Sequence, residues 1–242
     1  VCAVGWTTLM NGGNDSACVR SGKIAFAKTT ADGTKRATDA IVRAKKAGCD
    51  AVIAIVHGGD EYEPQTANVM KQAKRAAEVG ASAVVIHHPH VPSPVEVLTL
   101  ADGRRVPVFA SVGNLVTNQG ESWLPGMPPH FKGNRRYVAR NAWTRLGVIA
   151  DFSFAPRQAR PSVPHAVNAR VETQELTWGF HLLWIENDHP DHPFDPFPKI
   201  STRLLDPVSD RGIIARLSAD KEGPLALFDD PCWIEAKGGK CR

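Results

Sequence analysis

Four histidines lie in two short stretches of the sequence, and each stretch directly follows an apolar run. They are His57, His87, His88 and His90. A neutral imidazole is the commonest protein ligand for zinc and related ions, and several imidazoles can hold a metal while leaving a position open for water or substrate. A lone histidine at a strand end is more often a hydrogen-bonded core or loop residue, but four of the nine near two strand ends favour a metal or catalytic role. We predict His57, His88 and His90 as metal ligands and leave out His87, because neighbours in an extended segment point to opposite faces.

The two apolar runs are predicted to be buried strands of one sheet. Residues 51–56 and 83–86 are short and rich in β-branched side chains, and a helix-length segment, 64–80, separates them. This pattern is typical of a β-α-β unit, in which the two strands run parallel. The carboxyl ends of parallel strands meet at one edge of the sheet, where open α/β folds build their sites. The histidines should therefore lie together at that edge.

The remaining elements are predicted around this unit. The patterns indicate a helix over 35–48, strands over 95–100, 106–111 and 148–154, and short strands over 213–217 and 225–228. Residues 119–136 are rich in glycine and proline and are predicted to form a loop over the site. The segment 188–198 packs prolines among acidic residues and histidines, so it cannot be regular structure. We interpret it as an irregular surface segment, with a metal site as the alternative.

Three blocks of the sequence resemble the CapA-type capsule-synthesis family. The first block is 57–62, the second is 84–91 and the third is 111–115, and they follow in the order and at the spacing of the family pattern. The resemblance covers roughly residues 1–118. That family is similar in fold to the calcineurin-like metallophosphoesterases. The resemblance therefore implies an α/β protein, a layered α/β sandwich with a two-metal site at a strand edge, whose amino-terminal portion is not in this chain.

The resemblance also implies roles for individual residues. His57 matches an isolated histidine ligand of the family, and His88 and His90 match its His-x-His pair. The implied cofactors are divalent ions such as Mn, Zn or Fe. Glu61 could act as a general acid or base or hold a ligand histidine, and its alternative is a carboxylate at a helix start. Asn114 could bind a phosphate or carboxylate oxygen or orient a ligand, and its alternative is a simple turn.

Two functional classes follow from the resemblance. The first is a metal-dependent hydrolase of capsule or poly-γ-glutamate metabolism, in which divalent ions activate water against a phosphoester or a γ-glutamyl amide bond. The second is a non-catalytic binding or export protein for an anionic surface polymer. An intact set of metal ligands would favour the enzyme, so the sequence leaves enzymatic activity open.

The family motifs that supply the other metal ligands have no counterpart at the start of the chain. The sequence opens on Val1 within a strand-like segment typical of the middle of such a domain. We expect the carboxyl part of a longer protein, with the remaining ligands on a companion chain, and a shortened sequence is the equal alternative. Residues 1–155 are interpreted as the carboxyl part of the metallophosphoesterase-type domain. Residues 156–242 are interpreted as an irregular proline-rich extension with short strands packed on it.

Composition is that of a globular protein. The chain has 242 residues, of which 43% are hydrophobic and 22% charged. A net charge of +4, from 29 basic and 25 acidic residues, is too slight to imply binding to nucleic acid, although a local basic patch could attract an anionic polymer. No apolar run is long enough to span a bilayer.

Five cysteines indicate an oxidising compartment. None shows the Cys-x-x-Cys spacing of a structural zinc site. Pairs of Cys2 with Cys18 and of Cys232 with Cys241 would close short loops, as in a secreted protein. Cys49 is then interpreted as a buried thiol, with a bridge to a companion chain as the alternative. We expect the protein to be extracytoplasmic: secreted, periplasmic or at the cell surface.

Overall fold

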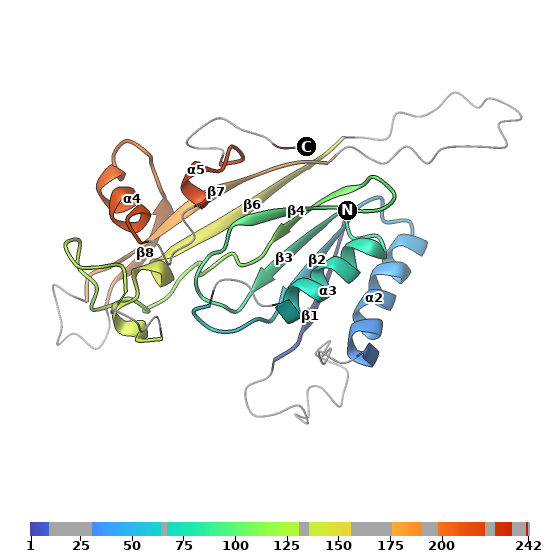
Figure 1. Cartoon of the computed structure of the whole chain (residues 1–242), viewed down its shortest axis with the longest axis horizontal. Helices are drawn as coiled ribbons and strands as arrows, with labels where there is room; N and C mark the ends of the chain where they lie inside the picture. The colour runs from blue at the N-terminus through green and yellow to red at the C-terminus, as the bar shows by residue number, and fades with distance from the viewer. Residues whose placement is uncertain are drawn as a thin grey trace, which may run out of the picture.

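A five-stranded sheet lies at the centre of the structure, a computed structural model (Figure 1). The structure describes residues 1–9, 31–63, 67–130, 136–155, 176–189, 198–220, 226–233 and 241. The strand order is β1-β2-β3-β5-β4. The strands are β1 (Cys2–Thr7), β2 (Val52–His57), β3 (Ala83–His87), β4 (Val95–Thr99) and β5 (Arg105–Phe109). Only β4 runs antiparallel to its neighbour, so four strands point their carboxyl ends to one edge.

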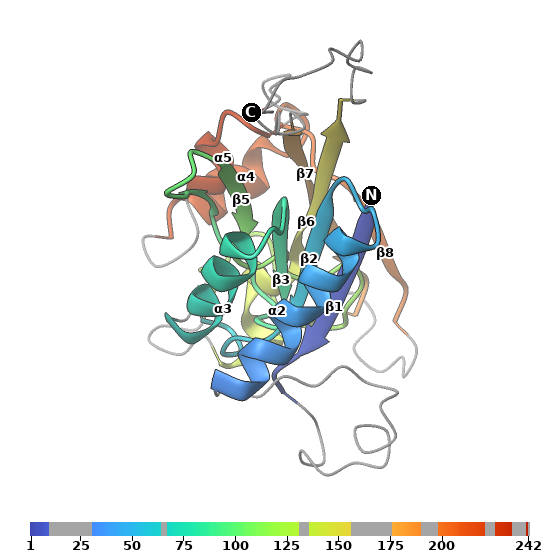
Figure 2. The ribbon, with the colours of Figure 1, turned by 90° about the vertical axis from the view of Figure 1, so that its right-hand side faces the viewer.

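Two helices cover one face of this sheet. The helix α2 (Ala31–Lys46) precedes β2, and α3 (Ala67–Glu78) connects β2 to β3. Figure 2 shows α2 and α3 side by side in front of β1, β2 and β3. Ile41 of α2 and Val69 of α3 are buried against alternate residues of the strands, such as Val84. Burial of these helical stripes on the sheet forms the β-α-β unit that the sequence predicts.

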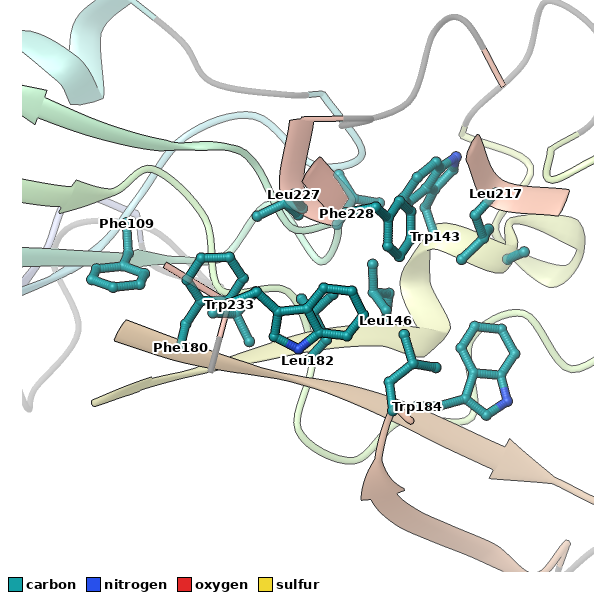
Figure 3. Close-up of a cluster of buried hydrophobic side chains, with 14 of the residues drawn as sticks. Phe109, Trp143, Leu146, Phe180, Leu182, Trp184, Leu217, Leu227, Phe228 and Trp233 are labelled. Carbon is teal, nitrogen blue, oxygen red and sulfur yellow. The ribbon is translucent and has the colours of Figure 1, made fainter. Parts of the chain in front are cut away.

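A second sheet covers the opposite face. It contains the antiparallel strands β6 (Leu146–Phe154), β7 (Leu176–Asn187) and β8 (Ile200–Leu204). Phe109 at the end of β5 meets three aromatic rings of this sheet edge to face, and its ring centroid lies 5.6 Å from Phe152, 5.7 Å from Trp178 and 6.4 Å from Phe180. Figure 3 shows Phe109 and Phe180 in this cluster. The helices α2 and α3, the central sheet and the second sheet form the layered α/β sandwich that the family resemblance implies.

Short helices complete the hydrophobic core that includes the aromatic side chains of the second sheet. They are the 3-10 helices Val138–Arg140 and Ala142–Arg145 and the α-helices α4 (Arg211–Ser218) and α5 (Ala226–Asp229). Leu217 of α4 and Leu227 of α5 are fully buried in the aromatic cluster (Figure 3). No helix in the described ranges is both long and apolar enough to cross a bilayer.

The structure corrects the predictions for the carboxyl part. The strands predicted over 213–217 and 225–228 are wrong, because residues 213–217 lie in α4 and residues 226–228 lie in α5. A short apolar run does not distinguish a strand from one turn of a buried helix. The packing of these residues against the aromatic core determines that they are helical. The twelve-residue strand β7 was not predicted, and it pairs with β6 along the whole length of β6. Residues on both sides of position 155 therefore share a sheet, and we propose that they fold as one unit. Most of the proline-rich segment, 190–197, lies outside the described residues.

The disulfide pairing also differs from the prediction. Cys2 pairs with Cys49, so the predicted Cys2–Cys18 bridge and the buried thiol at Cys49 are both wrong. The parallel register places Cys2 beside Val52, and this brings the Cα atoms of Cys2 and Cys49 to 5.8 Å. Cys18 lies outside the described residues. The predicted Cys232–Cys241 bridge is present.

Candidate functional site

The histidines gather at the carboxyl edge of the central sheet. His57 ends β2 and His87 ends β3, and the two residues are partners in the parallel register. Their Nδ1 atoms lie 3.1 Å apart. The ring of His57 also lies 4.8 Å from the ring of His88. The expectation that His87 points away from the others is therefore wrong. The strand ends at this position, and the backbone of His88 breaks the alternation of an extended segment.

Unusual backbone conformations shape this edge. Tyr62, His88 and His90 have positive φ angles of 62°, 120° and 62°, and they are the non-glycine residues with positive φ in the described part of the chain. Such conformations cost on the order of 1–3 kcal/mol each and persist only where the surrounding structure enforces them. The backbone N–H of Tyr62 donates to the carbonyl oxygen of Pro89 over 2.7 Å, which ties the turn after β2 to the turn after β3. Among the described residues, the non-glycine positions with positive φ thus lie in the two turns that carry the candidate ligands.

Three side chains in these turns form a compact donor set. Glu61, His88 and His90 each offer one ligand atom, and these atoms lie within 4.8 Å of one another. The Nε2 atom of His90 lies 3.8 Å from Oε1 of Glu61. Two imidazoles with one carboxylate match the ligand preference of zinc and of other first-row divalent ions. The set differs from the predicted trio, because Glu61 takes the place of His57, whose ring stands beside that of His88.

Asn114 holds His90 in one orientation. It follows β5 in the chain, and its Oδ1 lies 2.9 Å from Nδ1 of His90. The amide Nδ2 faces three carbonyl oxygens, those of the His90 and Thr144 backbones and of the Gln119 side chain, at 2.9–3.1 Å. That surrounding fixes the amide with Oδ1 toward the imidazole. Since an amide oxygen only accepts, His90 donates from Nδ1, and its other ring nitrogen, Nε2, lies toward Glu61.

Gln119 and Tyr62 extend this network. The Nε2 atom of Gln119 donates to the hydroxyl of Tyr62 over 3.2 Å. The Tyr62 ring stacks on His90 with centroids 5.7 Å apart and planes 24° apart. His90 is therefore held at one ring nitrogen by Asn114 and on one face by Tyr62, while Gln119 links the two. The sequence assigned no role to Gln119, because nothing in its local pattern separates it from other loop residues.

The surroundings favour the neutral form of His57, His87 and His88. The pKa of His57 is lowered to about 4, first by burial and then by the neighbouring His87, His88 and His90. Burial also lowers the pKa of His87 and of His88, and for His88 the carboxylates of Glu61 and Asp60 oppose the fall. Imidazoles with a low pKa carry no proton near neutral pH. Protons therefore compete little with a metal ion for their nitrogens.

The alternative metal site around Asp188 gains no support. In the described ranges, Glu61, His88 and His90 are the group of three metal-ligating side chains that lies close together. His189 is near Asp188 in the chain, but its Nδ1 is buried without a hydrogen-bond partner among the described residues. The other acidic and imidazole groups of that segment lie at 190–197, outside the described residues.

Comparison with known proteins agrees with this geometry. Residues 2–119 match the family described as bacterial capsule synthesis protein PGA_cap. This part of the chain is similar to the CapA-type capsule-synthesis family. The matched segment runs from the first residue of β1 to Gln119, so it contains the whole donor set together with Asn114 and Gln119.

A curated relative supports the same assignment. The chain is 38% identical over 81 residues to the PGA biosynthesis protein CapA of Bacillus subtilis (strain 168). The match covers 33% of this chain and 20% of the relative, so the chain spans about one fifth of the length of the relative it matches. The relative therefore supports the similarity to the CapA-type family for part of the chain.

Proposed function

We propose that this chain supplies part of the divalent-metal site of a hydrolase in capsule or poly-γ-glutamate metabolism. The observation that carries the proposal is the convergence of Glu61, His88 and His90, with Nδ1 of His90 bonded to Asn114 and Nε2 turned toward Glu61. Similarity to the family over residues 2–119 supports the link to capsule synthesis. The metal would be a divalent ion such as Mn, Zn or Fe.

A divalent ion held there would lower the pKa of water, so that it could attack a phosphoester or a γ-glutamyl amide bond at neutral pH. Within the chain, His88 and His90 serve as neutral nitrogen ligands and Glu61 as the carboxylate ligand. Asn114 fixes the protonation and orientation of His90 through the bond to Nδ1. The neutral His57, whose ring lies 4.8 Å from that of His88, is available as a further ligand.

Three donors can hold one ion, whereas a two-metal site also needs a bridging carboxylate. We assign the remaining ligands to a companion chain or to residues outside the described ranges. Two divalent ions without a bridging anion would repel each other strongly, so the second ion should bind only when those ligands are supplied.

A second candidate function is a protein that binds or exports an anionic polymer without turnover. The specific observation in its favour is the basic character of the helices on the outer face of the sheet. The helices α2 and α3 together hold eight basic and three acidic residues, whereas the whole chain has 29 and 25. Such a surface attracts polyanions whether or not a metal is bound.

The two disulfides support an extracytoplasmic location. Cys2–Cys49 and Cys232–Cys241 would persist in an oxidising compartment and would be reduced in most cytosols. A location at or outside the cell surface also suits a protein of capsule metabolism. We therefore keep secreted, periplasmic or surface localisation as part of the proposal.

The test is metal binding and hydrolysis measured on matched variants. Glu61→Gln should weaken binding of Mn²⁺ or Zn²⁺, while Glu63→Gln, two residues along, should leave it unchanged, because Glu63 faces Arg136 and not the histidines. Metal content would be counted by elemental analysis and affinity by calorimetry. Phosphodiesterase and γ-glutamyl hydrolase assays should follow with the metal-loaded protein, with and without a candidate companion chain. Equal metal affinity in both variants would overturn the proposed donor set.

A further inference from the structure

A cleft between the outer helices is separate from the histidine site. It has a volume of about 530 Å³ and is lined by residues of α2 and α3: Thr34, Lys35, Thr38, Asn68, Lys71, Gln72 and Arg75. None of these residues belongs to the donor set of Glu61, His88 and His90. The volume is in the range of cavities that bind small molecules or polymer segments. Figure 2 shows the two helices that form its walls.

The walls of the cleft are basic. Lys35 pairs with Asp39 at 2.8 Å, and Arg75 pairs with Glu78 at 3.2 Å, so these two cations are partly compensated by carboxylates on their own helices. Lys71 has no ion-pair partner among the described residues. It lies one helical turn before Arg75, and a rise of 1.5 Å per residue puts the two Cα atoms about 6 Å apart along the axis. The cleft therefore presents several cations in a row and no uncompensated carboxylate among its lining residues.

The floor of the cleft contains an unsatisfied donor. Gln72 is 4% exposed, and its Oε1 accepts a hydrogen bond from Nε1 of Trp6 over 3.0 Å. Its Nε2 is buried and has no hydrogen-bond partner in the described part of the chain. A buried N–H group without an acceptor costs roughly 1–3 kcal/mol, so an incoming oxygen ligand would be favoured there. The unsatisfied amide favours an oxygen acceptor, and the basic side chains favour an anionic one.

The cleft also lies close to the turns that carry the metal ligands. Three of its four α3 residues, Asn68, Lys71 and Gln72, belong to the first half of the helix, which follows the turn after β2. Gly59 in that turn packs between Val69 of α3 and Pro89, the residue between His88 and His90. A polymer long enough to pass from the cleft over this turn would reach the carboxyl edge of the sheet.

We propose that the α2–α3 cleft is a binding site for one strand of a polycarboxylate, with Lys71 as the central contact. This inference rests on the proposed function for the identity of the polymer, since poly-γ-glutamate carries one carboxylate on each residue. Successive carboxylates would meet Lys35, Lys71 and Arg75, and the cleft would hold the strand while a neighbouring stretch enters the metal site. Lys35 and Lys71 would contribute flexible point charges, and the guanidinium of Arg75 would match a carboxylate with its planar fork.

The test compares charge reversals that change the net charge equally. Lys71→Glu lies in the cleft, and Lys74→Glu is the matched control, because Lys74 is exposed on the same helix but does not line the cleft. A second pair is Lys35→Glu with Arg36→Glu on α2. Binding of fluorescently labelled poly-γ-glutamate to the full chain would be followed by anisotropy in EDTA. Circular dichroism would confirm that each variant is folded.

We expect Lys71→Glu to weaken polymer binding about three- to tenfold and Lys74→Glu by less than about twofold at 0.15 M salt, where distant charges are screened. Equal weakening of polymer binding by both substitutions would show general attraction to a basic surface. It would overturn the assignment of the cleft as the binding site. Tighter binding of a single-stranded DNA of equal charge would overturn the choice of a polycarboxylate. The assay needs neither metal nor turnover. The cleft can therefore bind the polymer even if the protein is not a hydrolase, and the donor set can bind a metal even if the cleft does not bind the polymer.

Discussion

His90 donates a hydrogen bond from Nδ1 to Oδ1 of Asn114 over 2.9 Å, and this contact fixes which nitrogen of the imidazole can bind a metal. The two residues come from turns after different strands, and the amide of Asn114 is itself held by the backbone of Thr144. A ligand fixed in this way loses little conformational freedom when it binds. The pair therefore turns a flexible histidine into a preorganised ligand.

Replacement of Asn114 should weaken metal binding without removing a ligand. We expect Asn114→Ala to lower the affinity for Zn²⁺ or Mn²⁺ about 10- to 100-fold, because outer partners of ligand histidines contribute about that much. Isothermal titration calorimetry measures the change. Asn118→Ala is the control, since Asn118 contacts Asn187 and no histidine. If the Asn114→Ala variant binds the metal as tightly as the wild-type protein does, His90 is oriented by other groups.

Gln119→Leu should have a smaller effect in the same direction. The substitution removes the acceptor for Asn114 and the donor to Tyr62, but Asn114 keeps its contacts with His90 and Thr144. We expect metal affinity to fall by less than in Asn114→Ala, about two- to tenfold. A metal titration of the two variants side by side gives the order. A larger loss in Gln119→Leu than in Asn114→Ala would contradict the network.

The metal-free protein should lose stability as the pH falls from about 6.5 to about 4. The pKa of His57 is lowered from 6.5 to about 4 in the folded protein, so the unfolded chain binds its proton first as the pH falls. Above pH 6.5 the residue is neutral in both states and contributes no pH dependence. Urea unfolding in EDTA at pH 7 and at pH 5 would show the loss. The His57→Gln variant should show a smaller difference between the two pH values, and an unchanged difference would argue against the low pKa.

The disulfides should be detectable by thiol labelling. Cys2–Cys49 and Cys232–Cys241 use four of the five cysteines, so iodoacetamide should label at most one site in denatured, unreduced protein and five after reduction. Mass spectrometry gives the count. The pair Cys2 and Cys49 closes a loop of 47 residues, and the double variant Cys2→Ser/Cys49→Ser should lose about 2–4 kcal/mol of unfolding free energy. Five labelled thiols without reductant would contradict the pairing and the extracytoplasmic proposal.

Phe109 should be important for the stability of the sandwich. It is 1% exposed and lies between the central sheet and the rings of Phe152, Trp178 and Phe180. We expect Phe109→Ala to reduce the free energy of unfolding by about 3–5 kcal/mol, since a large cavity would remain. Leu115→Ala is the control, because Leu115 is 63% exposed and should change stability by less than about 0.5 kcal/mol. Urea unfolding followed by fluorescence would compare the two.

The sequence by itself determined the β-α-β unit and the edge at which His57, His88 and His90 lie. Apolar runs and helical periodicity are local signals, and parallel pairing of the two strands then places their last residues together. The three motif blocks that resemble the CapA-type family also fall within the matched residues 2–119.

The tertiary structure alone decided which side chains form the donor set. Glu61 enters it in place of His57 because the turns after β2 and β3 adopt positive φ at Tyr62, His88 and His90, and contacts between the turns impose these conformations. The same holds for Gln119, for the Cys2–Cys49 pair and for the helical state of 213–217. Each depends on a partner distant in the chain, and a local pattern carries no information about which distant partner will be met.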